Sequence, residues 1–195
     1  DFIEINKKHK DLTIGKYSAK HTTFFEDIKK WQSSKYQKEI DIRPLQYTVE
    51  LTNKCNCNCK DCGMAANRLE TNRSTIKEQD LIKLVDDLEK NGIPAYAITG
   101  GEPFLEFQKM CAMMNHSQGK IDVCKIISNG FWGKNVEYYF EEMEKNGLLK
   151  NNFFTPSMQI SIGEQTIPME YIFNIIEYAT KQYTEKDLNI GIITS

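Results

Sequence analysis

The sequence predicts an α/β fold built on a parallel sheet. Strand-like runs alternate with amphipathic helical patterns over residues 46–195, and glycine-rich or polar segments follow several of the strand-like runs. Strands that alternate with helices are joined by right-handed crossovers, which makes the sheet parallel and gathers functional groups at the carboxyl ends of the strands. We therefore expect one edge of the sheet to carry the chemistry of this chain.

The first strand and helix enclose a cysteine-rich loop. The run 45–51 is strand-like and leads directly into this loop. After the loop, Thr75 and Glu78 have the spacing of a capping box, and apolar residues then recur at helical intervals. Asn91-Gly92 ends the run, so the segment is predicted to be strand, loop and helix in that order.

The later elements repeat this alternation. They are a strand over 95–98, a helix over about 104–115, a strand over 121–127, a helix with Val136, Phe140 and Met143 inward, a strand over 157–162, a helix with Ile172, Ile175, Ile176 and Ala179 inward, and a strand over 188–193. The chain stops on this fifth strand.

The first 45 residues lie outside this pattern. Phe24, Ile28 and Trp31 recur on one face of an expected amphipathic helix. We divide the chain into an N-terminal extension, 1–45, and a core, 46–195. An apolar helical face favours packing over substrate recognition for the extension.

Bulk composition favours a soluble protein of one domain with a real core. Hydrophobic residues make up 40% of the chain, and no apolar run is long enough to span a bilayer. The formal net charge of -2 provides no basic field for nucleic acid, so a nucleic-acid substrate is disfavoured. Cysteines crowded into one segment suit a reducing interior, and we expect a cytoplasmic protein with no membrane partner.

Four of the six cysteines fall within residues 55–62, where Cys55, Cys59 and Cys62 have the spacing C-x-x-x-C-x-x-C. Three thiolates on one tight loop leave an iron–sulfur cubane one iron short of protein ligands. A zinc site is the alternative, but zinc sites usually close with a second pair of ligands. Cys111 and Cys124 stand far apart in sequence and are expected in the core.

Two further segments follow strand-like runs. In Gly100-Gly101-Glu102 the glycines would let the backbone approach a ligand, and the carboxylate could accept hydrogen bonds from a ligand amine. Ser128-Asn129-Gly130 is the second segment, although Asn-Gly is also a common turn. Either segment alone is weak evidence, and their order after the cysteine loop is what gives them weight.

Taken in order, these three segments resemble the radical S-adenosylmethionine (radical SAM) superfamily. The resemblance covers roughly residues 46–195 and implies a partial (β/α) barrel, usually of six units. Because this chain stops on its fifth strand, the resemblance implies a barrel that is truncated after strand five. It implies a [4Fe-4S] cluster held by Cys55, Cys59 and Cys62. It also implies S-adenosyl-L-methionine as second cofactor and an electron donor of the flavodoxin or ferredoxin type.

The resemblance also suggests which residues meet S-adenosylmethionine. By position these are Gly100, Gly101, Glu102, Ser128, Asn129 and Ser161. Ser161 could instead be a strand serine whose hydroxyl bonds to the backbone. No catalytic residue beyond the cofactors is indicated.

The sequence departs from the family pattern at three places. Many relatives carry a later arginine that meets the ligand carboxylate, but no arginine follows Arg73, which leaves backbone amides or Lys181 as donors. Asp61 stands where relatives often have an aromatic residue or histidine. Cys57 replaces a common apolar residue; we expect it to pack as a small hydrophobe, although it could compete as a cluster ligand.

The sequences of residues 50–55 and 128–132 look most like those of the branch of the superfamily that modifies peptides and proteins (SPASM-like). We therefore expect a peptide or protein substrate, with epimerisation, crosslinking or thioether formation after hydrogen abstraction. The alternatives are a glycyl-radical activating enzyme, a small-molecule isomerase or dehydrogenase, and a non-catalytic metal-binding module.

Overall fold

The computed structural model describes residues 30, 44–60, 62, 75–150, 154–163 and 167–194. The chain divides into two compact units, Asp1–Pro44 and Leu45–Ser195. The amphipathic helix expected around Phe24, Ile28 and Trp31 lies outside the described residues. The fold below is that of the second unit.

Five parallel strands form one sheet in the order β1-β2-β3-β4-β5, and helices connect them. The elements are β1 (Tyr47–Thr52), α3 (Glu78–Lys90), β2 (Ala95–Gly100), η2 (Pro103–Glu106), α4 (Phe107–His116), β3 (Val123–Ser128), η3 (Phe131–Asn135), α5 (Val136–Lys145), β4 (Ser157–Ile162), α6 (Met169–Gln182) and β5 (Asn189–Thr194).

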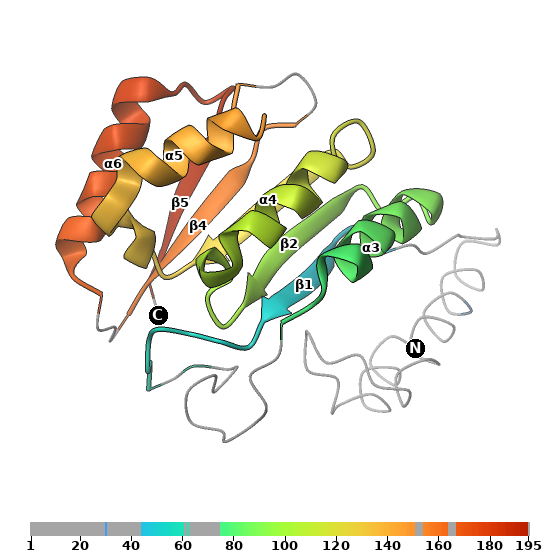
Figure 1. The fold of residues 1–195 in the computed structure, drawn as a ribbon, viewed down its shortest axis with the longest axis horizontal. Helices are drawn as coiled ribbons and strands as arrows, with labels where there is room; N and C mark the ends of the chain where they lie inside the picture. Colours follow the sequence, from blue (N-terminus) through green and yellow to red (C-terminus); the bar gives the residue numbers. More distant parts are fainter. Residues whose placement is uncertain are drawn as a thin grey trace. The chain divides into compact units, whose positions relative to one another are not determined.

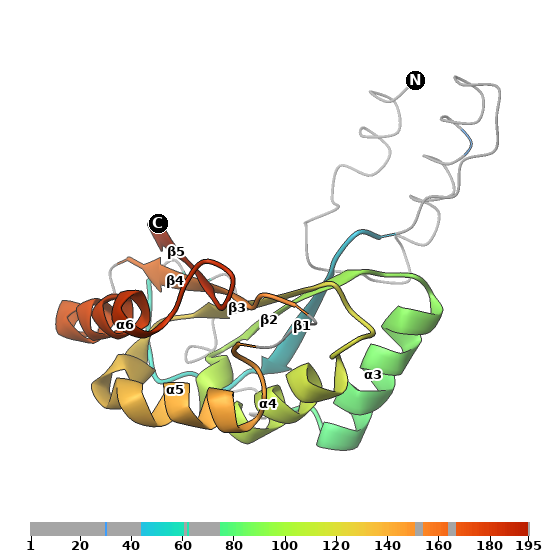
Figure 2. The same ribbon diagram turned by 90° about the horizontal axis from the view of Figure 1, so that it is seen from above.

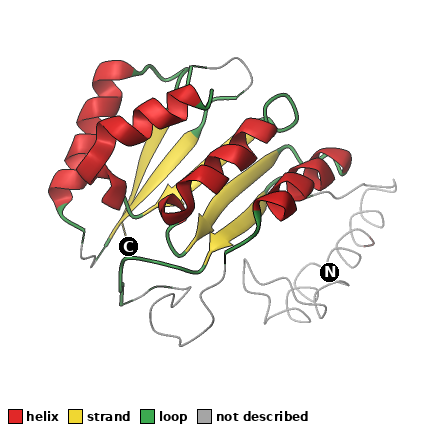
Figure 3. Cartoon of the chain, in the orientation of Figure 1, coloured by secondary structure: helices red, strands yellow, loops and turns green. Residues whose placement is uncertain are grey.

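The strand order explains the arrangement of the layers. Each strand pairs with the next strand in the sequence, so crossovers of a single hand place every connecting helix on the same face. Figures 1 and 2 show α3, α4, α5 and α6 along one face of the curved sheet. Secondary structure alternates regularly along this unit (Figure 3). The described unit is an open, partial barrel, and the predicted α/β fold with parallel strands is confirmed.

The core lies between the helices and the sheet. Most of the predicted inward positions of the helices are buried, including Phe140 of α5 and Ile175 of α6, whereas Val136 and Ile176 are only partly buried. Cys111 and Cys124 are also fully buried, as expected for core cysteines. None of the helices within the described ranges has the length and apolarity needed to cross a membrane.

Two local predictions were wrong. Thr75 does not cap α3: the N-cap residue is Lys77, without a side-chain hydrogen bond, and the Thr75 hydroxyl bonds to Thr52 and Glu106 instead. The helix expected from residue 104 begins as the short 3₁₀ helix η2 and becomes α-helical only at Phe107. Thr52 and Glu106, which bond to Thr75, lie far from it in the sequence, and the Glu102 carboxylate caps η2 by accepting from the Phe104 amide. The residue spacing used for the two predictions shows neither contact.

Candidate functional site

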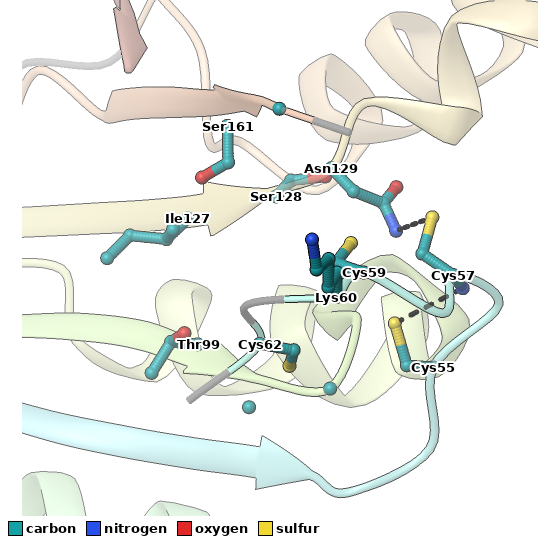
Figure 4. A pocket seen from close by; sticks show the side chains of 13 residues that line it. Cys55, Cys57, Cys59, Lys60, Cys62, Thr99, Ile127, Ser128, Asn129 and Ser161 are labelled. Atoms are coloured by element: carbon teal, nitrogen blue, oxygen red, sulfur yellow. Dashed lines mark hydrogen bonds between the residues drawn. The ribbon is translucent and has the colours of Figure 1, made fainter. Parts of the chain in front are cut away.

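The predicted segments meet in one pocket at the carboxyl ends of the strands (Figure 4). The pocket has a volume of about 270 Å³. Its lining residues are Cys55, Cys57, Cys59, Lys60, Cys62, Thr99, Gly100, Gly101, Ile127, Ser128, Asn129, Ser161 and Gly163. Of the nine predicted site residues, only Glu102 is not part of this lining.

The segment Gly100-Gly101-Glu102 binds the backbone just before the first cysteine. The Gly101 amide donates to the Thr52 carbonyl at 2.6 Å, and the Glu102 amide donates to the Lys54 carbonyl at 2.8 Å. A Cβ at Gly101 would lie 2.0 Å from the Lys54 oxygen, and Gly100 has a φ of +132° that favours glycine. The close approach that requires these glycines is therefore to the chain's own loop, where the sequence alone suggested an approach to a ligand.

Glu102 is buried behind the pocket lining, where its carboxylate accepts three hydrogen bonds. Its carboxylate accepts from the Phe104 amide at 3.0 Å, the Ser128 hydroxyl at 2.9 Å and the Asn129 amide at 2.8 Å. Complete burial raises its pKa to about 7, although these three donors act in the opposite direction. In this structure the carboxylate joins the ends of β2 and β3, so its expected bond to a ligand amine stays a prediction.

Asn129 connects the end of β3 to the cysteine loop. Its side-chain amide donates to Asn56 Oδ1 at 2.9 Å and to Cys57 Sγ at 3.1 Å, and its Oδ1 accepts from the Phe131 amide. Cys57 is 4% exposed, which agrees with packing as a small hydrophobe. Its thiol faces Asn129, whereas its amide donates to Cys55 Sγ at 3.4 Å.

A second set of bonds holds the residue before the first cysteine. Glu106 accepts from Lys54 Nζ at 2.8 Å and from the Thr75 hydroxyl at 2.9 Å, and Lys109 pairs with its other oxygen. Desolvation raises the pKa of Glu106, but these donors outweigh it and hold the pKa at about 2. The carboxylate therefore stays charged near neutral pH and anchors the loop to η2. This role could not be predicted from the sequence, because Lys54 and Thr75 lie 52 and 31 residues from Glu106 along the chain.

Several lining residues were missed because their types carry no chemical signature. Thr99 and Ile127 are the penultimate residues of β2 and β3, and Gly163 directly follows β4. Lys60 lies between the second and third cysteines and lines the same pocket. Position at a strand end was the signal that could have found the first three.

The chemistry of the pocket fits an iron–sulfur cluster. Cys55, Cys59 and Cys62 are half-buried on its wall, and none of the three is in a disulfide. Burial raises the pKa of Cys55, with Glu102 and the other two thiols adding to the effect, so cationic iron would favour its thiolate form. Within the described ranges no three His, Cys, Asp or Glu side chains converge on a single metal position. A cluster takes each thiolate at a different iron and does not require such convergence, unlike mononuclear zinc.

Arg73 and Asp61, which the sequence analysis singled out, lie outside the described residues. Lys181, considered as a donor to a ligand carboxylate, lies on α6, where its ammonium pairs with Glu177. It is not part of the pocket lining.

A comparison with protein families decides the family. The model of a family described as "4Fe-4S single cluster domain" matches residues 47–152, which include the cysteine loop and both polar segments. The chain belongs to this 4Fe-4S family. Its membership of the radical SAM superfamily, predicted from the order of the three segments, is thereby confirmed.

One curated relative is longer than this chain. The chain is 28% identical over 152 residues to YydG of Bacillus subtilis (strain 168), which is named for peptide biosynthesis, and the match covers 74% of this chain and 44% of YydG. The chain therefore spans less than half the length of that relative.

Two solved structures also resemble it. The crystal structure of Streptococcus suis SuiB bound to S-adenosylmethionine aligns with a TM-score of 0.49 at 14% identity, covering 98% of this chain and 60% of SuiB. The structure of HydG, a maturase of the [FeFe]-hydrogenase, aligns with a TM-score of 0.41 at 11% identity, covering 98% of this chain and 54% of HydG.

Proposed function

We propose that this protein is a radical SAM enzyme that modifies a peptide or protein. The observation that carries the proposal is the joining of three cysteines in the C-x-x-x-C-x-x-C spacing with the Gly100-Gly101 and Ser128-Asn129 segments in one pocket. Cys55, Cys59 and Cys62 would hold a [4Fe-4S] cluster, and the strand ends would hold S-adenosylmethionine beside it. With one electron from a flavodoxin- or ferredoxin-type donor, these cofactors supply a 5′-deoxyadenosyl radical that removes a hydrogen atom from the substrate.

The protein's own part is to fix the cysteine loop and shape the pocket. Backbone bonds from Gly101 and Glu102 hold the start of the loop, and Asn129 contacts Asn56 and Cys57 further along it. Anchoring at two separate points limits the positions that the three thiols can adopt. A reactive radical also needs shielding from water, and the Ile127 side chain gives this pocket an apolar part of its wall.

A peptide substrate is supported by the sequence relative. YydG is named for peptide biosynthesis and is similar to 74% of this chain. The sequences of residues 50–55 and 128–132 resemble those of peptide-modifying members of the superfamily and support the same substrate class. The structure describes all six cysteines and joins none of them in a disulfide, which suits a reducing compartment, and we place the reaction in the cytoplasm.

The test is anaerobic reconstitution with iron and sulfide, followed by reduction in the presence of S-adenosylmethionine and chromatography for 5′-deoxyadenosine. A pool of synthetic peptides in deuterated buffer is added to a parallel sample, and mass spectrometry detects loss of hydrogen or gain of deuterium. We expect 5′-deoxyadenosine in both samples and a mass change in some peptides. A colourless protein that binds zinc and forms no 5′-deoxyadenosine would contradict the reaction class. Product without any peptide change would contradict the substrate class for the peptides in the pool.

A further inference from the structure

The pocket contains a cationic side chain that no family motif explains. Among the described residues that line it, Lys60 is the one with a positive charge, and it lies between two of the proposed cluster ligands. Figure 4 shows its ammonium directed into the pocket, towards the ends of β3 and β4. An ammonium group has three hydrogen-bond donors and no acceptor, so it favours an anionic ligand group at this place.

Two other lysines, Lys54 and Lys181, do not line the pocket. Lys54 Nζ bonds to Glu106 Oε1 at 2.8 Å and does not line the pocket. Lys181 is paired with Glu177 on the same exposed helix face. The position of Lys60 is therefore distinctive among these three lysines.

A hydroxyl donor also lines the pocket. Ser161, on β4, has its side chain directed into the same pocket in Figure 4. A lysine and a serine that line one pocket can bind a carboxylate together, with a charge-assisted hydrogen bond from the ammonium and a neutral one from the hydroxyl. They belong to elements about a hundred residues apart in the sequence, which is why the pair could not be recognised before the fold was known.

We propose that Lys60, assisted by Ser161, binds the carboxylate of S-adenosylmethionine, an inference that rests on the function proposed above. The ligand carries a sulfonium, an amine and a carboxylate. Like charges repel, so only the carboxylate is complementary to an ammonium. The cysteine loop itself thus provides the cation for which the sequence offers no arginine after Arg73.

The alternative role for Lys60 is to compensate the negative charge of the thiolates and the cluster. The two roles differ in their dependence on the ligand. A lysine that serves the carboxylate affects binding only when the ligand carries that carboxylate, whereas a lysine that serves the cluster affects cluster loading or every ligand equally. Comparing two ligands on two proteins separates these cases, as a double-mutant cycle does.

The experiment measures equilibrium binding by calorimetry on anaerobically reconstituted protein, without reduction or turnover. The ligands are S-adenosylmethionine and decarboxylated S-adenosylmethionine, which keeps the sulfonium, the amine and the adenosine. The proteins are the parent, Lys60→Gln, Lys60→Arg and the charge-matched control Lys181→Gln. Iron and sulfide contents are determined first for each protein.

We expect Lys60→Gln to weaken binding of S-adenosylmethionine by about 10- to 100-fold, the range typical of a lost charge-assisted hydrogen bond. Binding of the decarboxylated ligand should not change, and Lys60→Arg and Lys181→Gln should bind both ligands as the parent does. An equal loss for both ligands, unchanged affinity, a loss in Lys181→Gln, or lower cluster content in Lys60→Gln would each overturn the proposal. A parent that loads the cluster but binds neither ligand would instead show that the proposed function itself is wrong.

Discussion

Replacing Glu102 by glutamine should change how the stability of this chain depends on pH. The carboxyl group is completely buried, and burial raises its pKa from 4.5 to about 7 in the folded chain. In the unfolded chain the same group releases its proton near 4.5. Between these values the folded chain binds more protons than the unfolded chain, so the free energy of unfolding falls as the pH rises through this window.

The expected magnitude follows from the width of the window. The interval from 4.5 to about 7, at roughly 1.4 kcal/mol per pH unit, corresponds to about 3 kcal/mol. This contribution is fully present below pH 4.5 and is lost above about pH 7. Glutamine has no proton to release, so Glu102→Gln should show no such fall. Its amide leaves one of the donors that now bond to Glu102 without an acceptor, which costs about 1–3 kcal/mol at every pH.

The assay is urea denaturation of the iron-free protein, followed by circular dichroism, at intervals from pH 5 to pH 8. We expect the parent to be the more stable protein at pH 5 and the difference between parent and Glu102→Gln to shrink towards pH 8 by most of about 3 kcal/mol. If the free energies of unfolding of the two proteins change in parallel with pH over this range, the predicted pKa shift is wrong, because Glu102 then does not titrate within it.

Two further substitutions test how the cysteine loop is held. Gly101→Ala should destabilise the chain by more than about 2 kcal/mol and reduce iron retention, since its Cβ would lie 2.0 Å from the Lys54 carbonyl oxygen; Gly191→Ala, whose Cβ would meet nothing closer than 4.0 Å, is the matched control in thermal denaturation. Asn129→Ala should lower iron content after gel filtration and destabilise the chain by about 1–3 kcal/mol, because it removes the side-chain bonds to the loop. Unchanged iron content in Asn129→Ala would show that these bonds do not position the loop.

Much of the fold could be predicted from local patterns. The strand over 157–162 was predicted with its observed bounds, and the helix over Met169–Gln182 buries three of the four residues expected from its apolar spacing, with Ile176 only partly buried. β2 runs two residues further than expected, through Gly100, because its last residues pair with β1. Such pairing depends on a partner more than forty residues away, which no local pattern contains.

The candidate site divides in the same way. The meeting of the cysteines with Ser128 and Asn129 could be predicted, because parallel strands bring their carboxyl ends together. The burial of Glu102 could not be predicted, since its donors come from β3 and its loop. Lys60 was equally obscure, because a lysine in a loop is usually solvated and only the fold shows that this one lines the pocket.

The most direct test of the account is the iron and sulfide content of four alanine variants, each reconstituted anaerobically and passed through gel filtration. We expect Cys55→Ala, Cys59→Ala and Cys62→Ala to lose the cluster and Cys57→Ala to retain it, since the Cys57 thiol faces Asn129. Retention of a full cluster by any of the first three variants, or its loss in Cys57→Ala alone, would contradict the ligand set on which the account depends.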